Sequence, residues 1–221
     1  MDRPRRDDFF TLIHKGLRRE LFAITTLAGT MDWDDAGDVA AFDASWQQLH
    51  HLLDIHAAHE DDHFLPLLAH AEPDLLAALD AAHHDLDEAL ADVASLIREA
   101  VAAHDQERGL RVHRELSAFV AGYLLHLLDE ETTVMPTIWE HCSDEDLART
   151  RASFLQAMAP ADAALSRRVM LPAMAPSERA GMLTIMRTSA PPPAFTAALD
   201  DARALLDDRA WRRLAADLSL A

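Results

Sequence analysis

The chain has 221 residues, of which 50% are hydrophobic, and its 38 acidic residues against 20 lysines and arginines give a formal net charge of −18. This length suits one large domain, or one domain with an appendage. The acidic balance argues against nucleic acid or an anionic membrane as a partner, because both attract basic surfaces. The charged start of the chain lacks the apolar stretch of a signal peptide, and no apolar run approaches the ~20 residues that span a bilayer. A single cysteine, Cys142, allows no internal disulfide, so we expect a cytoplasmic protein.

Apolar residues recur at spacings of three and four along most of the chain, and glycine is scarce, which predicts an all-α fold. The four long helices expected in the first part cover about residues 7–27, 39–69, 73–103 and 110–134. Pro66 and Pro136 should kink or end the second and fourth of these helices. Their lengths and short connections predict an up-down-up-down four-helix bundle.

The apolar seams of these four helices contain polar side chains that are costly to bury alone. Two seams carry a histidine and a glutamate four residues apart, which places both on one face of a helix. The six inward polar residues are His14, His56, Glu60, His83, His126 and Glu130. His14 precedes His83 by 69 residues and His56 precedes His126 by 70, so the helix pairs resemble each other and should bring the histidines to a similar depth.

The chain changes character after Cys142. All 13 histidines lie at or before His141, and the remaining residues carry no recognisable chemistry. We therefore predict a bundle domain over residues 1–142 and a helical C-terminal extension over residues 143–221. Within the extension, short helices are expected at about residues 143–158, 177–187, 194–206 and 208–218, separated by prolines. The extension is predicted to pack against the bundle or to join two copies in a homodimer.

Four imidazoles and two carboxylates in a bundle core suit a pair of transition-metal ions, with iron, manganese and zinc all fitting the donor set. In this pattern the sequence resembles the hemerythrin-like, or HHE cation-binding, domain family over about residues 7–140. The resemblance rests on the ordered set of six residues over four helices. It implies a non-haem diiron centre in which Glu60 and Glu130 bridge two irons and His14, His56, His83 and His126 are terminal ligands.

The sequence departs from the oxygen-carrying members of that family at two positions. Those members have a second histidine four residues after the third-helix ligand, where this chain has Asp87, and they end on a histidine and an aspartate five apart, where this chain has His126 and Glu130. Both differences resemble the broader bacterial HHE group. They leave open whether Asp87 is an oxygen ligand or whether one iron keeps an open position, which favours chemistry over reversible carriage.

The resemblance implies a protein that binds, senses or detoxifies O2, peroxide or NO. Two alternatives stay open at this point: an oxidoreductase that uses an external electron donor, and a structural bundle stabilised by zinc or manganese. His63 is a further candidate ligand, one turn past Glu60. The stretch His59-Glu60-Asp61-Asp62-His63 also matches the zinc-protease pattern, but that interpretation leaves His14, His83, His126 and Glu130 without a role.

Overall fold

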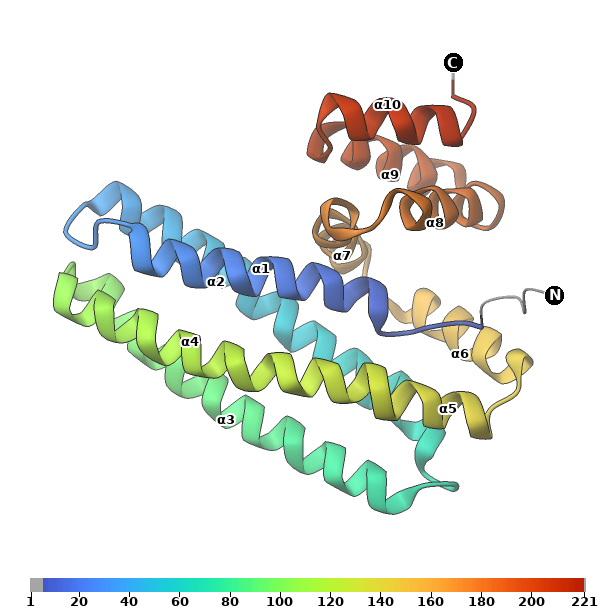
Figure 1. The fold of residues 1–221 in the computed structure, drawn as a ribbon, viewed down its shortest axis with the longest axis horizontal. Helices are drawn as coiled ribbons and strands as arrows, with labels where there is room; N and C mark the ends of the chain where they lie inside the picture. The colour runs from blue at the N-terminus through green and yellow to red at the C-terminus, as the bar shows by residue number, and fades with distance from the viewer. Residues whose placement is uncertain (1–5, 221) are drawn as a thin grey trace. The chain divides into compact units, whose positions relative to one another are not determined.

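The computed structural model describes residues 6–220, and within them the protein is all-α, without any strand, as predicted (Figure 1). Two compact units make up the chain. The first comprises the chain up to Thr11 and Glu20–Ala157, and the second comprises Leu12–Arg19 and the chain from Met158 onward. The proposed division after Cys142 into two domains stays a prediction.

The first part of the chain forms the four long helices that the periodicity predicts. They are α1 (Thr11–Thr30), α2 (Ala36–His59), α3 (Pro73–Ala103) and α4 (Gln106–Asp129). Aspartates fix two of the starts, because Asp35 accepts hydrogen bonds from backbone N–H groups at the start of α2, and Asp105 does so for α4. α3 packs against both α2 and α4.

Neither Pro66 nor Pro136 ends its helix directly, because a π-helical turn precedes each. η1 (Glu60–Phe64) follows α2, and η3 (Glu130–Val134) follows α4. The N–H of Leu65 donates to the carbonyl of Glu60, and the N–H of Met135 to that of Glu130, five residues back in both cases. A proline ring clashes with the carbonyl four residues before it in an α-helix, and the wider turn accommodates that conflict.

Both chain segments continue in helical form after the π turns. η2 (Leu65–Leu68) is a short 3₁₀ turn, and α5 (Met135–His141) packs against η2 and η3. Around them lies an apolar cluster that buries large side chains from several segments. Its fully or nearly buried members include Phe10, Phe64, Leu68, Val134 and Ile138. The two π turns therefore pack against an apolar core, and this packing fixes their geometry.

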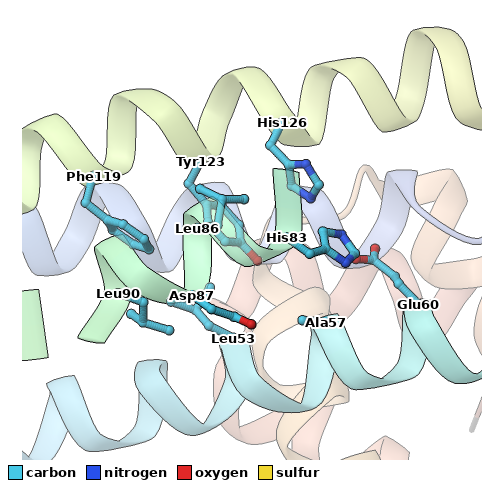
Figure 2. A pocket seen from close by; sticks show the side chains of 10 residues that line it. All are labelled: Leu53, Ala57, Glu60, His83, Leu86, Asp87, Leu90, Phe119, Tyr123 and His126. Atoms are coloured by element: carbon cyan, nitrogen blue, oxygen red, sulfur yellow. The ribbon is translucent and has the colours of Figure 1, made fainter. Parts of the chain in front are cut away.

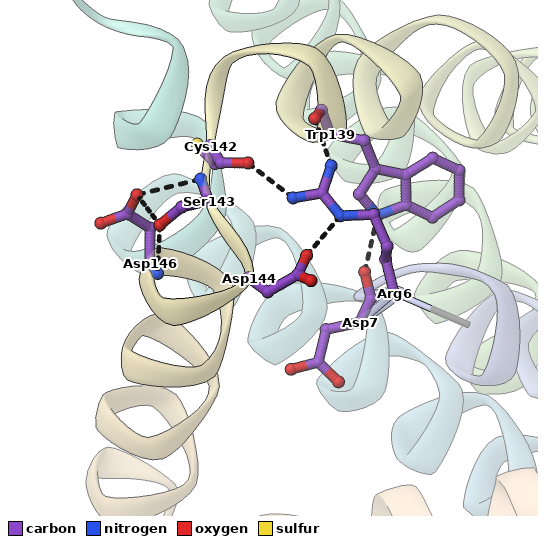
Figure 3. A network of polar contacts seen from close by, with 7 residues as sticks. All are labelled: Arg6, Asp7, Trp139, Cys142, Ser143, Asp144 and Asp146. Carbon is purple, nitrogen blue, oxygen red and sulfur yellow. Dashed lines mark hydrogen bonds and ion pairs between the residues drawn. The ribbon is translucent and has the colours of Figure 1, made fainter. Parts of the chain in front are cut away.

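The segment before α1 is fastened to the corner between α5 and α6 (Asp144–Ala157). Arg6 donates to the backbone carbonyls of Trp139 and Cys142 and pairs with Asp144, and the Trp139 indole N–H donates to the carbonyl of Asp7 at 2.7 Å (Figure 3). Burial raises the pKa of the Cys142 thiol, so the one cysteine is a neutral packing residue.

The second unit contains one helix more than expected beyond Met158. Its helices are α7 (Pro160–Ala173), α8 (Pro176–Ser189), α9 (Pro192–Leu205) and α10 (Asp208–Asp217). The prolines at 160, 176 and 192 begin helices rather than only interrupting the chain, because proline is compatible with the first helical turn. α9 packs against α7 and α8, around a core that includes Leu171, Leu183 and Leu214.

The Leu12–Arg19 segment of α1 makes close contacts within the second unit. A side chain at Gly16 would place its Cβ 2.7 Å from Cγ1 of Val169, so only glycine fits there. Lys15 Nζ lies 2.6 Å from Glu178 Oε1 in the same unit. None of the described helices is long and apolar enough to cross a membrane.

Candidate metal centre

The predicted histidine and glutamate pairs lie at the junctions between α-helix and π turn. His56 ends the apolar seam of α2 and Glu60 begins η1, while His126 and Glu130 occupy the same places on α4 and η3. Glu60 is 1% exposed and Glu130 is fully buried. Carboxylates are rarely buried to this degree unless charged or hydrogen-bonding groups surround them.

In both pairs the histidine Nε2 faces the carboxylate of its own helix at nearly the same distance. Nε2 of His56 lies 3.1 Å from Oε1 of Glu60, and Nε2 of His126 lies 3.2 Å from Oε1 of Glu130. His83 on α3 completes the group, because its Nε2 lies 3.7 Å from an oxygen of each glutamate. Three imidazole nitrogens and two carboxylates of the first unit therefore converge.

Asp61 orients the His83 ring from the opposite side. Oδ1 of Asp61 lies 2.8 Å from Nδ1 of His83. An ionised carboxylate only accepts hydrogen bonds, so Nδ1 carries the proton and donates it. The lone pair of His83 is thereby directed from Nε2 toward Glu60 and Glu130, which is the arrangement of a metal-ligating histidine with a carboxylate behind it.

The electrostatics of the two glutamates differ. Burial, together with the neighbouring Glu130 carboxylate, raises the pKa of Glu60 well above its usual range. Burial acts in the same direction on Glu130, but the nearby imidazoles of His126 at 3.2 Å and His83 at 3.7 Å outweigh it and hold the pKa of Glu130 well below its usual range. Glu60 therefore holds its proton to a higher pH than Glu130 does, and a cation bound between the two carboxylates would displace such a proton.

His83 responds to the same carboxylates. Burial disfavours its charged form, but hydrogen bonds to Glu130 and Asp61 outweigh burial and raise the pKa of the ring. A bound metal needs the neutral imidazole. Protons on Glu60 and His83 therefore compete with a metal ion for the site.

A cavity of about 20 Å³ lies beside this group in the first unit. That volume holds about one water-sized molecule. Glu60, His83 and His126 line one end, and Figure 2 shows Phe119 and Leu90 at the end away from them. Two further polar side chains border the cavity, the hydroxyl of Tyr123 and the exposed carboxylate of Asp87. Burial, followed by the Glu60 and Glu130 charges, raises the pKa of Tyr123, so its hydroxyl stays protonated.

Four of the predicted site residues, Glu60, His83, His126 and Glu130, form one group in the first unit whose candidate ligand atoms all lie within 4.8 Å of one another. His56 lies beside Glu60 in the same unit. His14 is buried on α1, in the Leu12–Arg19 segment that belongs to the second unit, so its part in the site stays a prediction.

His63, the alternative ligand, does not belong to the cluster of candidate ligand residues. Its ring packs at a centroid distance of 5.7 Å from Phe154, and His59 packs against the same ring at 5.0 Å. The zinc-protease interpretation requires His59 and His63 to converge on one ion with Glu60 outside it, whereas the described geometry groups Glu60 with His56 and His83.

Two residues beside the site are not among the site residues predicted from the sequence. The contact of Asp61 with His83 joins η1 to α3, 22 residues apart, so no local spacing signals it. Tyr123 precedes His126 by one helical turn and lines the cavity, but the same spacing is typical of an ordinary core residue.

Comparison with known protein families gives one match: residues 6–138 match the hemerythrin HHE cation-binding domain. Comparisons with curated proteins and with solved structures give no match. The matched range includes all six predicted residues and the whole of the cavity.

Proposed function

Because the chain belongs to the hemerythrin HHE cation-binding domain family, we propose that it is a non-haem diiron protein that binds, senses or detoxifies O2, peroxide or NO. In this proposal the two irons would be held by the carboxylates of Glu60 and Glu130 together with four histidines, His14, His56, His83 and His126. α1 to α4 form an up-down-up-down bundle around them.

The observation that carries the proposal is the burial of two carboxylates against three imidazole nitrogens in the first unit. Two buried carboxylates repel each other, and a shared pair of divalent cations removes that repulsion. Iron, manganese and zinc all accept imidazole and carboxylate ligands, so the donor set does not distinguish them. Iron is the proposed metal because of the family's diiron chemistry.

When bound, iron would supply a redox-active centre for a small oxidant. Residues of the chain would admit the small molecule, limit the entry of water and donate a hydrogen bond. The cavity admits one small molecule, its apolar walls at Leu53, Leu90 and Phe119 limit water, and the protonated Tyr123 hydroxyl offers a hydrogen-bond donor. Asp87 also lines this cavity. It would either supply an oxygen ligand to one iron or leave one coordination position of that iron open.

Metal analysis of protein produced in iron-replete cells tests the metal assignment, and two irons per chain are expected. Anaerobic reduction followed by addition of O2 or peroxide then tests the role. A stable coloured adduct supports binding or sensing, whereas repeated turnover with product release supports the alternative of an oxidoreductase with an external donor. A tightly held zinc or manganese that never reacts would favour the structural bundle instead.

We also expect a cytoplasmic location and a homodimer. A cytoplasmic location is supported by the single, neutral Cys142 thiol. A homodimer through the C-terminal extension is the second, and analytical ultracentrifugation of the full chain tests it.

A further inference from the structure

A surface groove of about 690 Å³ runs between α3 and α4 in the first unit. Its floor is apolar, with the buried side chains of Val93, Leu96 and Phe119. Three carboxylates and one guanidinium lie along it, from Asp92, Glu99, Glu115 and Arg111. A groove with an apolar floor and a net negative border favours small neutral molecules over anions.

Gly122 on α4 keeps one part of this groove open. A Cβ built on Gly122 meets no heavy atom within 4 Å, so the space beside it is empty. Glycine is less favourable than alanine in a helix interior. Neither local packing nor a turn requires glycine at this place.

The groove and the small cavity at the metal centre share two walls. Leu86 on α3 and Phe119 on α4 line both spaces. On the inner side, the cavity continues past Tyr123 to Glu60, His83 and His126 (Figure 2). Leu86 and Phe119 therefore border both the groove and the cavity at the centre, and rotamer changes of such side chains occur within nanoseconds where space allows.

We propose that the groove between α3 and α4 is the route by which a small neutral molecule reaches the metal centre, with Leu86 and Phe119 as the partition it passes. This inference rests on the proposed function, because it assumes that the loaded centre binds such a molecule. It adds the direction of approach, the residues that control the rate, and a preference for uncharged over anionic molecules.

Nitric oxide binding to the ferrous-loaded full chain tests the route, with Gly122→Leu as the plug and Gly181→Leu as the matched control. Gly181 on α8 also has open space around its Cβ position, but it belongs to the second unit and does not line the groove. A plugged route lowers the association and dissociation rate constants by the same factor, about tenfold here, and leaves Kd unchanged. Gly181→Leu should change neither rate constant, and iron content should be equal in all three proteins.

Leu86→Ala provides the opposite change, since a smaller partition should raise both rate constants severalfold at constant Kd. Unchanged rates in both Gly122→Leu and Leu86→Ala, with normal nitric oxide binding, would overturn the route and leave the proposed function intact.

If the loaded wild-type protein binds no nitric oxide, the proposed function fails, and xenon under pressure then decides the route in metal-free crystals. Xenon in the groove and the cavity of the wild type, but not in the cavity of Gly122→Leu, would support the route, and xenon in neither space would overturn it.

Discussion

The two histidine-glutamate pairs are nearly identical in backbone and differ in electrostatics. Each pair has four-residue spacing, a π turn that begins at the glutamate, a proline six residues later, and an Nε2–Oε1 distance of 3.1 or 3.2 Å. Yet the pKa of Glu60 is raised by burial, whereas the pKa of Glu130 is lowered because the imidazoles of His126 and His83 lie beside it and outweigh its burial. A repeated backbone therefore does not give equivalent carboxylates.

The largest effect should come from removing either carboxylate. Glu60→Ala and Glu130→Ala should each lower iron affinity by more than about 100-fold, because removing a carboxylate that is proposed to hold the metal should cost more than the 10–100-fold lost with a hydrogen-bond partner of a ligand. Metal content per chain by elemental analysis measures this. His84→Ala is the matched control, since His84 and Glu88 form an exposed pair with the same spacing at 3.4 Å. Full iron content in Glu130→Ala would show that the site is assigned wrongly.

Neutral substitutions should separate the two glutamates in the metal-free protein. Since the folded-state pKa of Glu60 is raised, its stabilising contribution is present below pH 4.5 and is lost as pH rises toward the folded-state pKa. Glu130 behaves oppositely, because its lowered pKa gives a contribution that is present above pH 4.5 and is lost only in acid.

At pH 7 we therefore expect Glu60→Gln to stabilise the metal-free protein and Glu130→Gln to destabilise it. Each change should be about 1–3 kcal/mol, the usual cost for an unsatisfied buried polar group. In a chain of this size that corresponds to about 2–4 °C in Tm per kcal/mol. Thermal unfolding between pH 5 and pH 8 measures it, and equal shifts of one sign would mean that the two carboxylates are equivalent.

The same protons should make metal binding pH-dependent. Glu60 and His83 both have raised pKa values, and both must lose their protons to bind a metal. Iron affinity should therefore fall as pH is lowered from 7 to 5, with proton release on binding, which calorimetry in buffers of different ionisation enthalpy detects. Affinity that rises on acidification would contradict the carboxylate assignment.

Asp61 offers a smaller, graded test. Asp61→Leu removes the acceptor for the His83 Nδ1–H and should weaken iron binding about 10–100-fold. Asp61→Asn keeps an acceptor oxygen and should recover most of that loss. Asp62→Leu changes an exposed neighbour and should have no effect. A merely structural role for Asp61 would affect unfolding but would not distinguish leucine from asparagine in iron affinity.

The smallest effect should follow from the prolines. Alanine at position 66 or 136 restores a backbone N–H and removes the ring clash, so an ordinary α-helical turn competes with η1 or η3. We expect a few-fold loss of iron affinity with little change in unfolding midpoint. The double variant should lose affinity at both pairs, and no loss at all would show that packing alone maintains the π turns.

Much of this arrangement could be predicted from periodicity. The all-α class and the approximate extents of α1 to α4 follow from apolar spacing, and the approach of three histidines to Glu60 and Glu130 in the first unit follows from charges that are costly to bury. The π turns could not be foreseen, because proline signals only a conflict with the α-helix and not its resolution. α7 is not predicted from the sequence because Pro172 indicates a break, whereas in the structure the α-helix continues through Pro172. The Asp61–His83 contact depends on tertiary packing, which no spacing encodes.

Tyr123 is the only tyrosine of the chain, and it borders the cavity at the centre. Biosynthetic replacement of tyrosine by a ring-fluorinated analogue would therefore yield one ¹⁹F resonance for the whole protein, reporting from the cavity that Glu60 also lines. Its chemical shift and line width would follow cation uptake, redox state and arrival of a gas in real time, without any label elsewhere in the chain.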